Sequence, residues 1–213
     1  SYNKSNNNKP MGYIIENLYL RTLLIKTIES NKNIKKIDSS IIFAERNLYS
    51  VKTKFENKKV FQAKLLIIAD GKNSNTRKNL GINTYEKDYH QKSLVTCIKH
   101  SKAHSGLAIE NFLPEGPLAS LPMLTRKNDN LSSIVWTCNT DTIDKLLKLN
   151  KLQLNKLIST KLEHILGKIS ITGPIASWKL SLKKSKSLVE HRLAVIGDAA
   201  HAIHPLAGQG FNL

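Results

Sequence analysis

The sequence predicts a mixed α/β fold in which an α/β domain is interrupted by an inserted β-rich domain. Residues 64–69, which are apolar after Lys64, are typical of a strand buried on both faces of an α/β sheet, and a second short strand is expected at residues 193–196. Between them, residues 92–139 show a β-rich pattern. The two strands belong to one domain, so the β-rich middle is an insertion between its two parts.

The other elements follow from apolar spacing and turn residues. Residues 12–31 predict a loop and a helix, in which Leu20, Leu24 and Ile28 are spaced for one buried face. Residues 34–69 predict several strands, with a hairpin turn at 56–58. Residues 141–166 predict one helix capped by Asp141 or Thr142, and a strand at 175–182 then returns the chain to the first domain.

Both strands of the α/β domain end in a turn that combines glycine with aspartate. The first runs into Asp70-Gly71, where Ser74 is placed to cap a helix that carries Arg77. The second runs into Gly197-Asp198, and Gly208-Gln209-Gly210 opens a further helix. Glycine lets the backbone approach a ligand, a carboxylate accepts hydrogen bonds from sugar-like hydroxyls, and a helix N-terminus attracts electron-rich oxygens. The pattern therefore predicts a nucleotide cofactor.

The string from Gly197 to Leu213 resembles the second flavin-binding motif of the FAD-dependent aromatic hydroxylases, the group A flavoprotein monooxygenases. In that family the aspartate binds the ribityl chain of FAD, and amides at the start of the next helix face the flavin's pyrimidine oxygen. The resemblance implies the first role for Asp198 and the second for Phe211 and Asn212. It also implies that cofactor-binding positions are Gly197, Pro205, Gly208, Gln209 and Gly210.

Residues 69–77 resemble the ADGxxSxxR segment of the same family, which lies near the FAD pyrophosphate and is implicated in flavin and NADPH binding. The resemblance implies cofactor-binding roles for Asp70, Gly71 and Arg77. An ordinary turn is the alternative, because Asp-Gly after a strand commonly forms one. The fold that the resemblance implies is a partial FAD/NAD(P)-binding Rossmann-like domain around the β-rich insertion.

Two further segments are similar to the hydroxylases of ubiquinone biosynthesis. Residues 12–21 resemble that group's segment leading into a helix, and residues 112–122, followed by 133–137, resemble its substrate-domain signature. Many relatives carry a flavin-contacting arginine at the position of Asn17, so Asn17 is assigned to cofactor contact, with a plain helix N-cap as the alternative. Residues 118–124 are expected to lie over the flavin and to form part of the substrate cavity.

The resemblance implies an FAD-dependent monooxygenase that hydroxylates a polyprenylated phenol in ubiquinone biosynthesis. In the family NAD(P)H reduces the flavin, oxygen forms a C4a-hydroperoxide, and the phenol ring attacks its distal oxygen. The cofactor carries this chemistry, so no side chain is assigned as a catalytic acid or base.

The family's N-terminal βαβ unit, with its G-x-G-x-x-G string, is not in this sequence. We therefore expect an internal fragment with four parts: a flexible polar tail at 1–11, part of the FAD-binding domain at 12–82, a β-rich substrate domain at 83–178, and a truncated return to the FAD-binding domain at 179–213. The partner that this implies is a complementary chain carrying the missing half. The alternative is a non-catalytic split-gene or decayed remnant that cannot bind FAD alone.

The formal charge of +17 raises the question of a nucleic-acid partner. Lysines make up 28 of the 33 basic residues and are scattered among many Asn and Ile residues, as AT-rich coding would produce, so no nucleic-acid partner is predicted. Basic surfaces also attract anionic lipid headgroups. Residues 179–186, with four lysines, are the local candidate for peripheral membrane association, and a solvated hairpin is the alternative.

Other features predict a cytoplasmic protein, with the inner face of the membrane as the place of any peripheral contact. No apolar run approaches the length that crosses a bilayer, and no leader pattern is present. Cys97 and Cys138 are too few for a disulfide framework or a thiolate metal site. His201 and His204 are three residues apart without a further ligand at suitable spacing, so no metal site is predicted.

Overall fold

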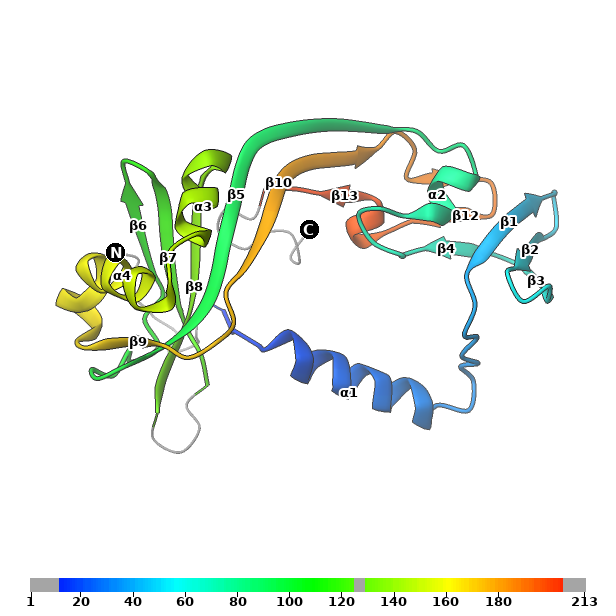
Figure 1. The fold of residues 1–213 in the computed structure, drawn as a ribbon. Helices are drawn as coiled ribbons and strands as arrows, with labels where there is room; N and C mark the ends of the chain where they lie inside the picture. Colours follow the sequence, from blue (N-terminus) through cyan, green and yellow to red (C-terminus); the bar gives the residue numbers. More distant parts are fainter. Residues whose placement is uncertain (1–11, 125–128, 205–213) are drawn as a thin grey trace, which may run out of the picture. The chain divides into compact units, whose positions relative to one another are not determined.

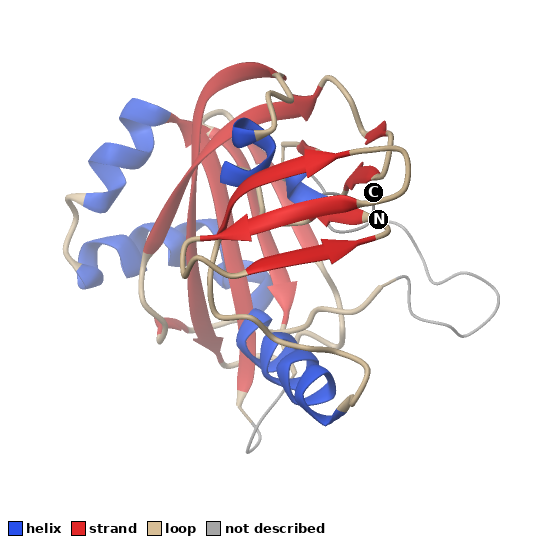
Figure 2. Cartoon of the chain, turned by 90° about the vertical axis from the view of Figure 1, so that its right-hand side faces the viewer, coloured by secondary structure: helices blue, strands red, loops and turns tan. Residues whose placement is uncertain are grey.

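The computed structural model describes residues 12–124 and 129–204, and the chain forms two compact units (Figure 1). Of the described residues, unit 1 contains 12–35, 92–124 and 129–178, and unit 2 contains 36–91 and 179–204. Helices and strands, blue and red in Figure 2, occur along the chain. The predicted mixed α/β class is confirmed.

Unit 1 is built on a sheet in which β5, β8, β7 and β6 follow one another, and β9 pairs with the end of β5. The bounds of these strands are β5 Thr84–His100, β6 Ile109–Leu113, β7 Gly116–Pro122, β8 Asn130–Asn139 and β9 Ile169–Ile171. A turn at residues 114–115 joins the antiparallel pair β6 and β7. The β-rich pattern of the middle of the chain is therefore confirmed.

Two helices pack on this sheet, α3 (Thr140–Leu147) and α4 (Lys151–Leu166). The apolar residues of α4 recur every four positions, which places them on one stripe of the helix. That stripe and the central strands share a core whose largest buried side chain is Trp136; the α4 residues in it are Leu154, Ile158, Leu162 and Leu166.

The single helix expected over 141–166 is wrong, because the structure has two. Asn139 accepts a hydrogen bond from the amide of Thr142 and caps α3, so neither Asp141 nor Thr142 is the cap. The chain then leaves the helix and starts again at Asn150, which exchanges hydrogen bonds with Gln153 in a capping box. Two satisfied helix starts stabilise the break.

Unit 2 contains two small sheets. In the first, β1 (Ile41–Arg46), β2 (Val51–Phe55) and β3 (Val60–Ala63) form an antiparallel meander. The hairpin predicted at 56–58 joins β2 and β3, with Lys58 at φ 65° and its amide bonded to the Phe55 carbonyl. The second has the order β11 (Val189–Glu190), β12 (Leu193–Val195), β4 (Leu66–Ile68). β13 (His201–Ala202) pairs with the end of β10 (Ala176–Ser185).

The strand predicted to be buried on both faces is buried on one. Leu66 and Ile68 are buried with Leu193 and Val195 of β12, while Leu65 and Ile67 are about half exposed in the described part of the chain. The apolar stretch correctly predicts a strand, but no part of the described chain covers its second face.

The helix α1 (Asn17–Ser30) occupies the predicted segment, but its expected buried face is not buried. Leu24 is 54% exposed and Ile28 39% exposed, and no residue of the helix is classed as buried. Asn17 is the first helical residue, and the N-cap position falls on Glu16. The spacing thus predicted the helix but not its surroundings.

The lysine-rich stretch lies in a strand rather than in a solvated hairpin. β10 continues to Ser185, beyond the predicted end at residue 182. Lys183 is buried, and its Nζ lies 2.6 Å from Glu86 Oε1, which lowers the pKa of Glu86, with help from a hydrogen bond from Thr84. One of the four lysines therefore forms an ion pair with a carboxylate of the same unit.

Candidate functional site

The two turns that combine glycine with aspartate, Asp70-Gly71 and Gly197-Asp198, lie at one edge of the β11–β12–β4 sheet. β4 and β12 are parallel, with Leu66 opposite Leu193 and Ile68 opposite Val195, and the amide of Ile196 continues the ladder to the Ile68 carbonyl at 2.9 Å. Parallel strands point their carboxyl ends the same way, so the turn after β4 and the turn after β12 emerge together. Ligands of open α/β sheets bind in this position.

The turn after β4, which we call the Asp70 loop (residues 70–74), is held by its own side chains. Gly71 has φ 87°, a conformation that suits glycine. Ser74 Oγ accepts a hydrogen bond from the amide of Arg77 at 2.9 Å and caps α2 (Asn75–Asn79), as predicted. Asp70 Oδ2 accepts from the amide of Thr76 at 3.2 Å. Burial raises the pKa of Asp70, but hydrogen bonds from Ser74 and Thr76 outweigh burial and lower it.

We call the turn after β12 the Asp198 loop (residues 197–200). Its last two residues are buried, whereas its aspartate is exposed. Gly197 has φ 57°, and residues Gly197–Ala199 form one 3₁₀ turn closed by the Ala200 amide on the Gly197 carbonyl at 2.9 Å. Ala199 and Ala200 are buried. Asp198 is exposed, and among the described residues its carboxylate makes no hydrogen bond or ion pair.

Arg77 joins the two loops. It is 1% exposed; its Nη1 donates to the carbonyl of Ala199, and its Nη2 donates to the carbonyl of Lys72 at 3.1 Å. The buried Nε has no hydrogen-bond partner in the described residues. The guanidinium therefore connects the Asp70 loop to a carbonyl that lies 122 residues after Arg77 in the sequence.

The space beside both turns is open. A Cβ atom built on Gly71 or Gly197 would meet no heavy atom within 4 Å in the described chain. Positive φ with open space is suitable for close approach of a ligand to the backbone. Together with the exposed Asp198 carboxylate, these positions fit a ligand that carries hydroxyl groups, such as the ribityl part of FAD.

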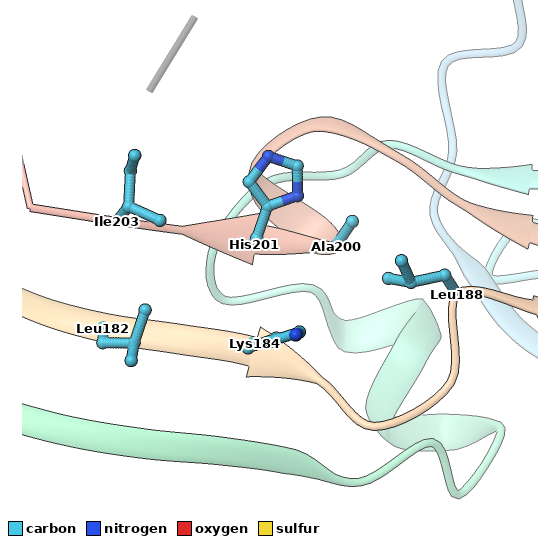
Figure 3. A pocket seen from close by; sticks show the side chains of 6 residues that line it. All are labelled: Leu182, Lys184, Leu188, Ala200, His201 and Ile203. Atoms are coloured by element: carbon cyan, nitrogen blue, oxygen red, sulfur yellow. The ribbon is translucent and has the colours of Figure 1, made fainter. Parts of the chain in front are cut away.

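A pocket of about 420 Å³ adjoins the Asp198 loop within unit 2 (Figure 3). Its lining is apolar apart from Lys184 and His201, which face each other across the β10–β13 pair; the lining residues are Leu182, Lys184, Leu188, Ala200, His201 and Ile203. Neither basic side chain has an ion pair among the described residues. Pockets of this size accept small apolar ligands.

Of the histidines considered for metal binding, His201 lies in β13 and His204 lies outside any helix, so the helical spacing that would bring them together is absent. His204 Nε2 lies 3.0 Å from Gln91 Oε1, and burial lowers the pKa of His204. In residues 12–124 and 129–204, no group of three or more His, Cys, Asp or Glu side chains is arranged to hold a metal.

The structure brings Asp70, Gly71, Arg77, Gly197 and Asp198 together at one sheet edge. Asn17 belongs to α1 in unit 1, whereas these five residues belong to unit 2. The other predicted positions lie outside the described residues: Pro205, Gly208, Gln209, Gly210, Phe211 and Asn212.

Sequence reasoning missed the backbone carbonyls of Lys72 and Ala199, which receive the Arg77 side chain. It also missed the pair of Glu86 and Lys183. A carbonyl has no sequence signal, and alternation from the buried Leu180 would have placed Lys184 inside rather than Lys183, because the burial period of β10 shifts between residues 180 and 183.

Within the described residues, no helix has the length and apolar character that crossing a membrane requires.

A family model described as FAD binding domain matches residues 45–213. Ubiquinone hydroxylase UbiL of Rhodospirillum rubrum is 35% identical over 204 residues, which cover 95% of this chain and 47% of that protein. The 3-demethoxyubiquinol 3-hydroxylase of Escherichia coli is 32% identical, over 95% of this chain and 51% of its own length. The chain thus spans about half the length of these relatives.

Solved structures support the same fold. PqsL, a probable FAD-dependent monooxygenase from Pseudomonas aeruginosa, superimposes with a TM-score of 0.75 at 17% identity, over 91% of this chain and 55% of that one. CmlS, a flavin-dependent halogenase, gives a TM-score of 0.69 at 16% identity, over 92% and 37%. The family model covers most of the sequence and includes both loops of the site, so this chain belongs to the FAD binding domain family.

Proposed function

We propose that this chain is part of an FAD-dependent monooxygenase that hydroxylates a polyprenylated phenol in ubiquinone biosynthesis, with NAD(P)H as the electron donor. The observation that carries the proposal is the pairing of β4 with β12, which sets the Asp70 and Asp198 loops at one sheet edge. The names of the relatives, ubiquinone hydroxylases and 3-demethoxyubiquinol 3-hydroxylase, support the substrate class.

In this proposal the protein binds, orients and shields, while bound FAD supplies the oxygen and electron-transfer chemistry. Asp198 accepts hydrogen bonds from cofactor hydroxyls, and Gly197 lets the ligand approach the backbone. Asp70 and Ser74 hold the neighbouring loop. The apolar pocket at Leu182 and Ile203 offers a surface that excludes water beside the Asp198 loop.

We further propose that a complementary segment or chain completes the site. Two apolar surfaces support this: the open face of β4, with Leu65 and Ile67, and the exposed residues of α1. Exposed apolar surfaces of this kind commonly mark interfaces. If so, the chain alone binds FAD weakly, which also agrees with the second candidate, a remnant without activity of its own.

The experiment compares the chain alone with the complete enzyme. The chain alone, purified with added FAD, should not retain a stoichiometric flavin absorbance band, and retention of one would contradict the need for a complement. The complete gene should restore ubiquinone synthesis in a bacterial strain that lacks its ring hydroxylases, with the accumulated intermediate identified by mass spectrometry. A folded, flavin-loaded protein that rescues no ring-hydroxylation step would reject the substrate assignment.

A further inference from the structure

Arg77 is a fully buried cation without a buried anion beside it. No carboxylate lies within 4 Å of its guanidinium among the described residues, and the nearby Glu86 is paired with Lys183. Taking a charge out of water without a counter-charge is energetically costly. A residue retained at such a cost needs a role that a neutral side chain could not perform.

The geometry of the guanidinium supplies that role. Its two terminal nitrogens donate to carbonyls of different loops, Ala199 in the Asp198 loop and Lys72 in the Asp70 loop. The planar fork of arginine presents several donors in fixed directions, whereas a lysine ammonium is a single point on a flexible stem. Only arginine can hold both carbonyls at once.

The element that carries Arg77 also needs this support. The helix α2 has five residues, too few to be stable without tertiary contacts. Ser74 and Asp70 fix its start, and Arg77 fixes it against the Asp198 loop. Because Ala199 follows Asp198 directly, a hydrogen bond to the Ala199 carbonyl restricts the backbone that aims the Asp198 carboxylate.

We infer that Arg77 is a positioning residue, which locks the Asp198 loop to the Asp70 loop and promotes cofactor binding through Asp198 rather than by touching the cofactor. The inference rests on the proposed function only in assigning FAD as the ligand of Asp198. Its structural half, the lock between the loops, is independent of any ligand. The buried position of the side chain is the reason that direct contact is excluded from the inference.

A double-mutant cycle in the complete enzyme tests the coupling. Arg77→Met should weaken FAD about tenfold or more, since hydrogen bonds from a charged group are lost. In an Asp198→Ala background the same substitution should have little further effect, because the loop no longer carries the ligating carboxylate. Arg77→Lys should not restore binding. Additive effects of Arg77→Met and Asp198→Ala, or rescue by lysine, would show that the charge acts on the cofactor directly and would overturn the inference.

A matched control is Arg46→Met, because Arg46 also ties distant segments of unit 2, pairing with Glu190 at 2.7 Å and donating to the His191 carbonyl. It should lower stability without changing FAD affinity. Failure of Asp198→Ala to affect FAD would remove Asp198 from the site and overturn the inferred effect of Arg77 on the cofactor, while the lock between the loops has a separate test. Hydrogen exchange on the chain alone tests the lock: amides 197–200 should exchange about tenfold faster in Arg77→Met and be unchanged in Arg46→Met.

If the arginine variants do not fold, the unmodified enzyme can still show whether Arg77 holds the two loops together and whether it contacts FAD. In protein with ¹⁵N-labelled arginine, the Arg77 side-chain resonances should be slowly exchanging and should shift little when FAD is added. A large FAD-induced shift of these resonances would indicate contact with the cofactor, and rapid exchange would indicate that the lock is absent.

Discussion

Asp198→Ala should separate cofactor binding from folding. Among the described residues Asp198 makes no hydrogen bond or ion pair, and its side chain is exposed. Its removal therefore costs the fold little, within about 0.5 kcal/mol as for other exposed positions. If its carboxylate accepts hydrogen bonds from FAD hydroxyls, loss of these charge-assisted bonds costs about 1.5–3 kcal/mol of binding free energy.

The expected result in the complete enzyme is a dissociation constant for FAD raised about tenfold or more, at 1.4 kcal/mol per decade. Asp198→Asn should give a smaller loss, because an amide oxygen still accepts hydrogen bonds but carries no charge. Quenching of flavin fluorescence measures the affinity, and urea unfolding of the same preparations measures stability.

The control is Asp88→Ala. Asp88 is also an exposed aspartate of unit 2, lies in β5 outside both loops, and accepts a hydrogen bond from the His90 amide at 2.8 Å. The substitution Asp88→Ala removes the same charge as Asp198→Ala and should leave FAD affinity unchanged. An equal loss of affinity in both variants would point to a general electrostatic effect, and unchanged affinity in Asp198→Ala would remove Asp198 from the site.

Three further outcomes concern the framework around the site. Ser74→Ala should destabilise the chain by about 1–2 kcal/mol in urea unfolding, because the buried Arg77 amide loses its acceptor, whereas Ser39→Ala, which removes a surface acceptor of the Asn57 amide, should cost less. Asp70→Asn should cost stability at neutral pH. Because the pKa of Asp70 is lowered in the folded state, the ionised carboxylate stabilises the fold above about pH 4, and this contribution is lost as the pH falls through the folded pKa; a difference from wild type that persists unchanged in acid would contradict this. Burial, with Glu115 nearby, raises the pKa of Cys138 to about 11, so iodoacetamide at pH 8 should modify it more slowly than the half-buried Cys97, as mass spectrometry of the two peptides can show.

Local sequence signals predicted the elements that local physics determines. The hairpin at 56–58 follows from turn residues between two alternating strands, and Lys58 indeed adopts positive φ there. The break between α3 and α4 was also readable in principle, because Asn150 and Gln153 have the spacing of a capping box. The apolar run over 141–166 concealed it, since both helices bury their apolar residues in the same core.

Contacts between distant segments could not be predicted in this way. Periodicity shows which residues of α1 are apolar, but not what covers them, and Leu24 and Ile28 are exposed in the described chain. The Arg77 bridge depends on a carbonyl 122 residues away, and every residue except proline has the same backbone groups. The resemblance implied a cofactor-binding role for Arg77, whereas the hydrogen bonds of its guanidinium in the structure go to two backbone carbonyls of the protein.

The two aspartates of the site differ in their hydrogen bonds, and we expect them to have different roles. Asp70 already accepts the Thr76 amide, and its hydrogen bonds lower its pKa, so it stabilises its own loop. Asp198 has no such partner in the described residues and is exposed at the same sheet edge. A carboxylate whose acceptor sites are free can bind ligand hydroxyls without breaking a protein contact. We therefore expect Asp198 to contribute to binding directly and Asp70 to contribute through the shape of its loop, so that only Asp70→Asn should change stability and affinity together.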